Sequence, residues 1–178
     1  MEPVDHPAPG AAGRPVVLTL CTGNAARSVM AGAMLTPAPV EIVTAGTHVV
    51  EGQPMSRRTR DALATVGVSA DGHRSHQLTD GDLERAGLVI AMAGEHVAYV
   101  RRRHPAAASR TATIRRLVRD LGDGPEPLSE RVDRLELANV GIEGWEDVED
   151  PAGGEDDVYV ACARDLFELS GRLLPRLR

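Results

Sequence analysis

The sequence predicts a single-domain α/β protein with an open, parallel, four-stranded sheet flanked by helices. Short runs of β-branched and aliphatic residues alternate with helix-like segments along most of the 178 residues. This alternation is typical of parallel strands joined by crossover helices. The length suits one domain with one core, and an apolar content of 42% favours a folded chain over a disordered one.

The strands are predicted from short apolar runs that are bounded by turn-forming residues. The first run leads into a turn that contains Gly23 and Asn24, and the second is closed by Gly46. The predicted strands are residues 16–20, 40–44, 88–92 and 111–114.

The helices are predicted from apolar residues at three- and four-residue steps and from residues that favour helix ends. Thr79 or Asp80 can cap one N-terminus, and Gly67 suits the end of an earlier helix. The predicted helices are residues 25–35, 56–66, 79–85, 94–103, 115–121, 128–139 and 156–174, the last preceded by an acidic loop at 141–155. The apolar stripe of the last helix consists of Val158, Ala161, Cys162, Leu166, Leu169 and Leu173.

The first residues differ in composition from the rest of the chain. Residues 1–14 contain acidic residues and several Pro but no apolar core, which is untypical of a signal peptide. We therefore expect a disordered tail at 1–14 and a domain at 15–178. No apolar run approaches the ~20 residues that a membrane helix needs. The expected location is the cytoplasm, with reduced thiols and no membrane contact.

The composition excludes several kinds of chemistry. All 20 basic residues are Arg, so a Schiff-base lysine and a Walker-type phosphate lysine are excluded. Two cysteines, Cys21 and Cys162, are too few for a disulfide framework or a multi-cysteine zinc site. The formal net charge of −6 argues against nucleic-acid binding. We expect no metal and no cofactor.

The charges are unevenly distributed along the chain. Residues 101–119 contain seven Arg and no acid, whereas residues 123–157 contain thirteen acids and two Arg. We interpret these segments as two solvated faces that can attract each other. The alternative is a docking surface for an acidic partner.

The stretch from Cys21 to Ser28 carries the chemistry. It follows the first strand, and ligands of open α/β sheets bind beyond the carboxyl ends of the strands. The loop runs into a helix N-terminus, whose free N–H groups can converge on an anion. The guanidinium of Arg27 can bind two phosphate oxygens at once. The same positive field favours the thiolate form of Cys21, and Ser28 can donate a hydrogen bond to its sulfur. Phosphoryl transfer to sulfur, followed by hydrolysis, suits this arrangement.

Cys21, five residues, Arg27 and Ser28 after a buried strand resemble the phosphate loop of the low-molecular-weight protein tyrosine phosphatase family. Further segments resemble that family in the same order along the chain: Thr44-Ala45-Gly46-Thr47, Gly52-Gln53-Pro54-Met55, His73-Arg74-Ser75, Val89-Ile90-Ala91-Met92 and Asp150-Pro151.

The resemblance implies a role for each matching residue. Cys21 would be the nucleophile, Arg27 would bind the phosphate and stabilise the transition state, and Asp150 would protonate the leaving oxygen and then activate water. Pro151 favours Asp150 over its acidic neighbours because it restricts the preceding residue to extended geometry. The competing acids are Glu146, Asp147 and Glu149. The residues that would form and support the phosphate loop are Thr22, Gly23, Asn24, Ala25, Ala26 and Ser28.

Some positions depart from the family pattern. Ala26 stands where a second loop cysteine is frequent, and Ala152 and Gly153 stand where aromatic residues often follow the Asp-Pro pair. The other departures are Ala25, Val29, Val49, Val50 and Ala93. The aromatic walls of a phosphotyrosine slot are therefore missing.

The prediction is a cysteine-dependent, metal-independent phosphatase with a phosphocysteine intermediate. Its substrate would be phosphotyrosine in a protein or a small aryl or alkyl phosphate, with phosphate and vanadate as inhibitors. One alternative is an arsenate reductase on the same scaffold, although Cys162 is badly placed as a resolving thiol. The other is a phosphate-binding module with little turnover.

Several further residues are interpreted as structural. Cys162 is expected in the core, and His73 and His76 are expected to make structural hydrogen bonds. Trp145 is expected in a small satellite core, or alternatively over the pocket. The other histidines are expected at the surface or behind the site: His6, His48, His96 and His104.

Overall fold

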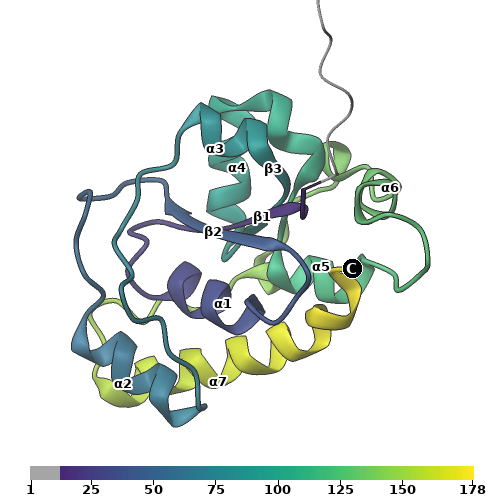
Figure 1. The fold of residues 1–178 in the computed structure, drawn as a ribbon. Helices are drawn as coiled ribbons and strands as arrows, with labels where there is room; N and C mark the ends of the chain where they lie inside the picture. The colour runs from purple at the N-terminus through teal and green to yellow at the C-terminus, as the bar shows by residue number, and fades with distance from the viewer. Residues whose placement is uncertain (1–12) are drawn as a thin grey trace, which may run out of the picture.

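A computed structural model describes residues 13–178 of the chain, so most of the expected tail, with His6, lies outside the described residues. The centre of the molecule is a four-stranded parallel sheet with the strand order β2-β1-β3-β4 (Figure 1). The strands are β1 (Val16–Cys21), β2 (Glu41–Gly46), β3 (Ala86–Ala91) and β4 (Thr111–Thr113). The predicted fold class is confirmed, and β1 runs one residue further than expected, so that Cys21 ends it.

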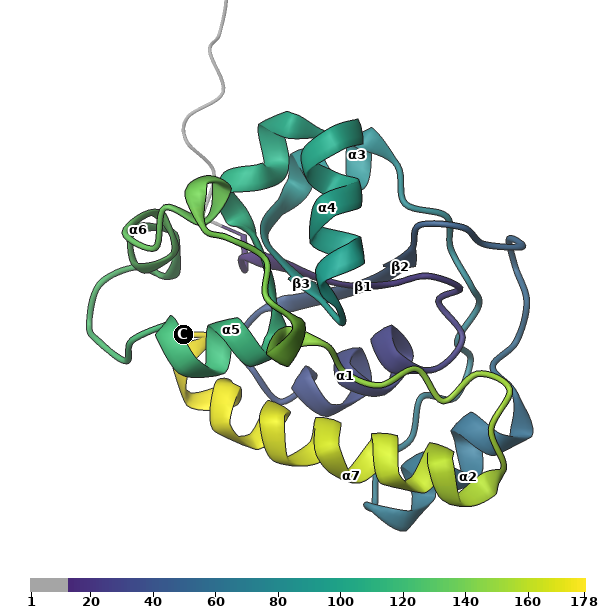
Figure 2. The ribbon, with the colours of Figure 1, turned by 180° about the vertical axis from the view of Figure 1, so that it is seen from behind.

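Helices cover both faces of the sheet, as the two opposite views show (Figures 1 and 2). Helices α1, α5 and α7 lie on one face with α2 beside α7, and α3 and α4 lie on the other. The helices are α1 (Arg27–Leu35), α2 (Arg57–Thr65), α3 (Asp80–Arg85), α4 (Gly94–Arg103), α5 (Ile114–Asp120), α6 (Leu128–Asp133) and α7 (Asp156–Leu173). The short 3₁₀ turns are Pro105–Arg110, Leu137–Asn139, Gly144–Glu146 and Leu174–Arg176.

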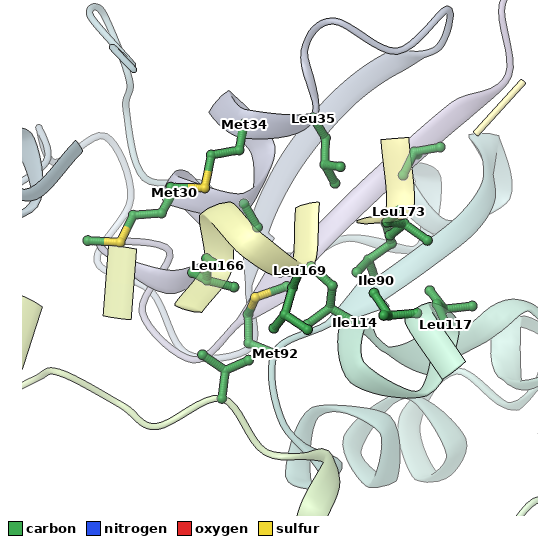
Figure 3. Packing of buried hydrophobic residues seen from close by; sticks show 14 of the residues in the cluster. Met30, Met34, Leu35, Ile90, Met92, Ile114, Leu117, Leu166, Leu169 and Leu173 are labelled. Atoms are coloured by element: carbon green, nitrogen blue, oxygen red, sulfur yellow. The ribbon is translucent and has the colours of Figure 1, made fainter. Parts of the chain in front are cut away.

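The alternation of side chains along each strand divides the core between the two faces. On β3, Leu88 and Ile90 pack toward α1 and α7, whereas Val89 packs with Leu18 and Leu20 on the opposite side. Because aromatic residues are only 2% of the chain, aliphatic and Met side chains fill the larger cluster (Figure 3).

The last helix carries the predicted apolar stripe except at its first two positions, of which Val158 is half-buried and lies outside the core clusters. Cys162 is 6% exposed and lies in the main core cluster, as expected. Ala161 is exposed, however, and Ala163 takes its place in the core.

Two helices differ from their predicted ranges by more than one residue at an end, in each case because of local backbone geometry. Helix α1 begins at Arg27 rather than residue 25, since Asn24 has a φ of 49° and Ala26 is not helical. The prediction of one helix at 128–139 is wrong. The chain leaves the helix after Asp133, and Glu136 adopts a left-handed φ of 48°. This reversal places Leu137 in the core.

The basic segment at 101–119 is only partly solvated: Arg102, Arg103 and Arg119 are exposed, as expected, whereas the other four arginines donate to distant segments of the chain. Arg101 donates to the carbonyls of Leu137 and Val140, and Arg110 donates to those of Leu83 and Ala86. The guanidinium groups therefore fix neighbouring loops to the sheet. The expected attraction between the basic and acidic segments is present, but much of it is buried.

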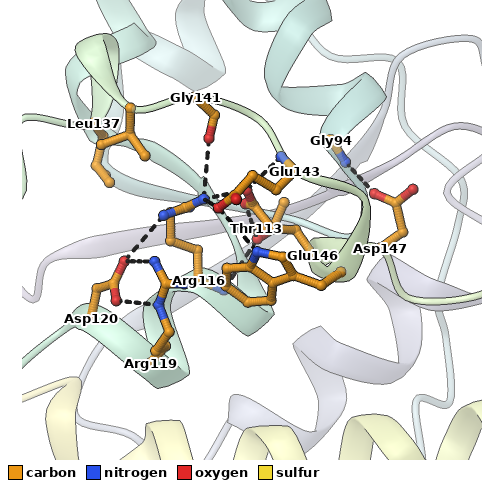
Figure 4. A network of polar contacts seen from close by, with 12 residues as sticks. Gly94, Thr113, Arg116, Arg119, Asp120, Leu137, Gly141, Glu143, Glu146 and Asp147 are labelled. Carbon is orange, nitrogen blue, oxygen red and sulfur yellow. Dashed lines mark hydrogen bonds and ion pairs between the residues drawn. The ribbon is translucent and has the colours of Figure 1, made fainter.

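Arg116 is at the centre of the contacts between the basic and acidic segments, and it is only 5% exposed (Figure 4). The guanidinium donates to Glu146 Oε1 at 2.5 Å, to Glu143 Oε2 at 3.0 Å and to Asp120 Oδ2 at 3.3 Å. The other oxygen of the buried Glu146 accepts from Thr113 Oγ1 at 2.8 Å. These hydrogen bonds raise the pKa of Arg116, with Glu146 as the main cause. A loop more than twenty residues away is thereby fixed to α5 and β4.

Trp145 completes this network from outside. Its ring lies 4.3 Å from the guanidinium carbon of Arg119 and 5.2 Å from that of Arg116, and its Nε1 donates to Glu143. The side chain is 41% exposed. Trp145 is therefore neither a core residue nor a pocket wall, and it stabilises the arginines by cation–π contact.

We expect Arg116→Ala to lower the free energy of unfolding by about 3–5 kcal/mol, because it leaves the Glu146 carboxylate buried without its partner. Urea unfolding followed by circular dichroism measures this change. The exposed Arg102 is the matched control, and its replacement by Ala should stay within about 0.5 kcal/mol of wild type. Equal effects of the two substitutions would contradict a structural role for the buried pair.

Candidate active site

The predicted phosphate loop lies at the carboxyl edge of the sheet, between β1 and α1. Cys21 is buried at the end of β1, whereas Gly23 and Ala25 are exposed. Gly46, at the end of β2, is in close contact with this loop. A Cβ atom there would come within 2.5 Å of the Thr22 carbonyl oxygen. Only a residue without a side chain allows the loop to lie this close to the sheet. The sequence indicated this role of Gly46 only through the family resemblance of Thr44-Ala45-Gly46-Thr47.

Asn24 holds the loop in shape from its centre. The residue is fully buried with a positive φ. Its Nδ2 donates to Ser28 Oγ at 2.9 Å, its Oδ1 accepts from the backbone N–H of His76 at 2.9 Å, and its carbonyl accepts from His73 Nε2 at 2.9 Å. Ser28 Oγ lies 3.0 Å from Cys21 Sγ. Because Ser28 Oγ accepts from Asn24, its own hydrogen is free to be donated to the sulfur of Cys21.

The two histidines of the His73–His76 segment make the structural hydrogen bonds that the sequence predicts. The His76 ring bridges Glu51 at 3.0 Å and Asp82 at 2.8 Å. Hydrogen bonding to Glu51, the largest cause, raises the pKa of His76. The bridge ties the loop after β2 to α3, next to the phosphate loop.

Arg27 connects the phosphate loop to the acidic loop that precedes α7. Its guanidinium is nearly inaccessible and donates to the Val148 carbonyl at 3.1 Å and to Asp150 Oδ2 at 2.9 Å. The Asp150 side chain is half exposed, and its other oxygen accepts from the Ala152 N–H at 3.1 Å. The thiol, the guanidinium and one carboxylate therefore share one site, and the carboxylate faces solvent.

The part of the acidic loop that precedes Asp150 in the sequence is fixed to the edge of the sheet. The Val148 N–H donates to the Met92 carbonyl at 2.8 Å, and Asp147 Oδ1 accepts from the Gly94 N–H at 2.7 Å (Figure 4). Two of the three acids that compete with Asp150 are thus engaged elsewhere. Glu146 is paired in the buried network, and Asp147 caps α4.

One residue of the site was not singled out from the sequence. His96, in the first turn of α4, takes the second of its two expected positions, behind the site: it is 1% exposed, and its Nε2 lies 2.9 Å from Thr22 Oγ1. Its Nδ1 accepts from the Ala93 N–H at 3.1 Å. Burial, and next the charge of Arg27, lower the pKa of His96 to about 4. Its position just after β3 is the one signal that the sequence offered.

Cys162 has a different environment from Cys21. It borders a cavity of about 390 Å³ behind the acidic loop, which Arg115 and Asp165 also line. Burial raises the pKa of the Cys162 thiol to about 12. The protonated thiol is therefore a poor resolving group for reductase chemistry.

Among residues 13–178, no group of three or more His, Cys, Asp or Glu side chains is arranged to hold a metal ion. In the same part of the chain, no helix combines the length and apolar character needed to cross a bilayer.

Residues 16–143 match the family model described as low molecular weight phosphotyrosine protein phosphatase. The chain belongs to this family. It is a low molecular weight protein phosphatase, a hydrolase, and the reductase and binding-module alternatives are not favoured. The match includes Cys21 to Ser28 and ends before Asp150.

Similar proteins extend over more of the chain. It is 32% identical over 165 residues to the protein-arginine-phosphatase of Geobacillus stearothermophilus, covering 91% of this chain and 95% of the relative. The probable low molecular weight protein-tyrosine-phosphatase EpsP of Ralstonia solanacearum is 30% identical, with coverages of 72% and 92%. Among solved structures, the YwlE arginine phosphatase from Geobacillus stearothermophilus superposes with a TM-score of 0.73 at 31% identity and covers 92% of each chain.

The burial of neutral His96 should make the protein less stable in acid. Because its folded pKa lies below the ordinary 6.5, the unfolded chain takes up a proton between pH 6.5 and about 4 that the folded protein does not. Stability should therefore fall by up to about 3 kcal/mol as the pH decreases through this window. Urea unfolding at pH 7 and pH 4.5 measures the loss. His96→Asn, which does not titrate, should lose less than wild type, and an equal loss in both would contradict the assignment.

Proposed function

We propose that this phosphatase hydrolyses phosphomonoesters through a phosphocysteine intermediate on Cys21 and without a metal ion. The thiolate attacks phosphorus, so that an S–P bond forms while the P–O bond to the leaving group breaks. Asp150, as the carboxylic acid, protonates the departing oxygen. Its carboxylate then takes a proton from water, the water oxygen bonds to phosphorus, and the S–P bond breaks to release phosphate and the thiolate.

The contact between Arg27 and Asp150 carries this proposal. It joins the candidate acid to the loop that holds the nucleophile, across 123 positions of sequence. A phosphoryl dianion that enters the loop meets Arg27 and the N–H groups of residues 22–27, which supply the positive field that a metal supplies elsewhere. The dianion also competes with Asp150 for the guanidinium. Substrate binding would therefore release the carboxyl group for proton transfer.

The substrate that we propose is a phosphorylated side chain of a protein or a small phosphomonoester, with phosphate and vanadate as competitive inhibitors. Asp150 is followed by the small exposed residues Ala152 and Gly153, and Val50 is 74% exposed. These positions offer no aromatic surface for stacking. A phosphoarginine side chain is a second candidate, because one relative is named a protein-arginine-phosphatase. Initial rates on two peptides that differ only in the phosphorylated residue, phosphotyrosine or phosphoarginine, distinguish the two candidate substrates.

A nucleophilic thiol also needs reducing surroundings, and we therefore propose a cytoplasmic location.

Cys21→Ala should reduce turnover of para-nitrophenyl phosphate to background, because no other group can accept the phosphoryl group. Phosphate should still bind, since the backbone N–H groups and Arg27 remain. Steady-state kinetics with EDTA present and calorimetric titration with phosphate measure the two properties. Cys162→Ala is the matched control and should keep turnover. Phosphatase activity in Cys21→Ala would refute the covalent mechanism.

Asp150→Asn should lose most activity where the leaving group most needs a proton. We expect a decrease in kcat of about 10²–10⁴-fold on an alkyl phosphate and a smaller one on para-nitrophenyl phosphate, whose leaving group is a stable anion. The comparison of kcat across phosphate esters of increasing leaving-group pKa measures this dependence. The exposed neighbour Glu149→Gln should show none. If Glu149→Gln gave the leaving-group dependence instead, the assignment of the acid would be wrong.

A further inference from the structure

The hydrogen bonds around His96 define which of its ring nitrogens carries the proton. Nδ1 accepts from the Ala93 N–H, so its lone pair is occupied and it carries no hydrogen. In the neutral ring the hydrogen is therefore on Nε2, the atom that lies 2.9 Å from Thr22 Oγ1. A carboxylate oxygen of Glu95 lies 3.6 Å from the same nitrogen, which also favours a hydrogen there.

This tautomer fixes the direction of the hydrogen bond between α4 and the phosphate loop. Nε2–H of His96 donates and Thr22 Oγ accepts, so the hydroxyl hydrogen of Thr22 is not used by the histidine. Within residues 13–178, the Thr22 hydroxyl makes no second hydrogen bond. In the opposite tautomer, Nε2 of His96 would accept the hydroxyl hydrogen of Thr22. Only the lone pairs of the Thr22 oxygen would then be left to face an anion.

The free hydrogen belongs to the residue next to the candidate nucleophile. Cys21 is buried, Thr22 is half-buried, and Gly23 and Ala25 are exposed, so Thr22 is intermediate in burial between the candidate nucleophile and the exposed residues of the loop. A hydroxyl dipole whose positive end is oriented before the substrate arrives stabilises developing negative charge without reorganisation.

We propose that His96 is a positioning residue that presents the Thr22 hydroxyl as a hydrogen-bond donor to the phosphoryl group bound in the loop. The inference rests on the proposed phosphatase reaction at Cys21. Thr22 would touch a non-bridging phosphoryl oxygen, and His96 would act only through Thr22. The neutral ring that this requires persists through the neutral pH range, because burial and Arg27 lower its pKa to about 4.

Two substitutions of His96 separate positioning from helix capping. An Asn side chain can accept from the Ala93 N–H, as Nδ1 does, but cannot reach Thr22. A Gln side chain can place an N–H near the position of Nε2 but forms the cap poorly. Positioning therefore predicts that His96→Asn is the more stable variant and the less active one, whereas His96→Gln has the opposite ranking.

The experiment measures kcat/KM on para-nitrophenyl phosphate, the inhibition constant of vanadate and the melting temperature for these two variants and for Thr22→Val and Thr22→Ser. Loss of a hydrogen bond to a charged group should lower kcat/KM by about 10–100-fold in Thr22→Val and His96→Asn. The vanadate inhibition constant should rise by a similar factor, because vanadate occupies the phosphoryl site. Thr22→Ser and His96→Gln should recover most of both properties.

The double variant Thr22→Val/His96→Asn gives the decisive comparison. If His96 acts through Thr22, the double variant should be no worse than Thr22→Val alone, whereas independent effects would multiply. Multiplying effects, or an unchanged vanadate constant beside reduced turnover, would overturn the inference. Neither result affects the proposed reaction, which depends on wild-type turnover and on the Cys21→Ala variant.

Discussion

The guanidinium of Arg27 is the group on which the geometry of the site depends. It is almost fully buried at the start of α1, and it bonds one backbone carbonyl and one carboxylate of a loop that precedes α7. A buried cation is costly unless it is paired and hydrogen-bonded. The contacts with Val148 and Asp150 meet that requirement in the absence of substrate. The interaction that stabilises Arg27 is thus the same one that joins the Asp150 carboxylate to the loop that holds the thiol.

The contact between Arg27 and Asp150 can position the carboxylate only if the acidic loop before α7 is also held by other interactions. Three independent attachments provide this: the pair between Arg116 and Glu146, the cap that Asp147 provides for α4, and the backbone bond from Val148 to Met92. All of them lie on the N-terminal side of Asp150. After it come small residues, Ala152 and Gly153, and the chain is exposed there. The loop is therefore attached to the rest of the molecule up to the carboxylate and exposed at Ala152 and Gly153.

Local patterns were sufficient to predict the sheet, most helices and the phosphate loop. The run that ends at Cys21 and the spacing to Arg27 depend on neighbouring residues alone, so they can be read from one sequence. The end of α6 could not be predicted, because Glu136 adopts a left-handed conformation to bury Leu137. The partner of His96 could not be identified either, since Thr22 lies 74 positions away and nothing near His96 in sequence marks the contact. Four of the seven arginines of 101–119 looked solvated for the same reason, because the acceptors of Arg101, Arg110, Arg115 and Arg116 lie in distant parts of the sequence.

The packing of α7 has a consequence for how the protein is made. This helix contacts both α1 and α2, and the loop before it supplies Asp150. Contacts between segments so far apart in sequence form late and slow the folding of a domain. During synthesis, β1, the thiol and α1 emerge first, and the carboxylate and the helix that packs beneath them emerge last. A growing chain therefore carries the candidate nucleophile for most of translation before the candidate acid emerges, and the candidate site is complete only when α7 docks.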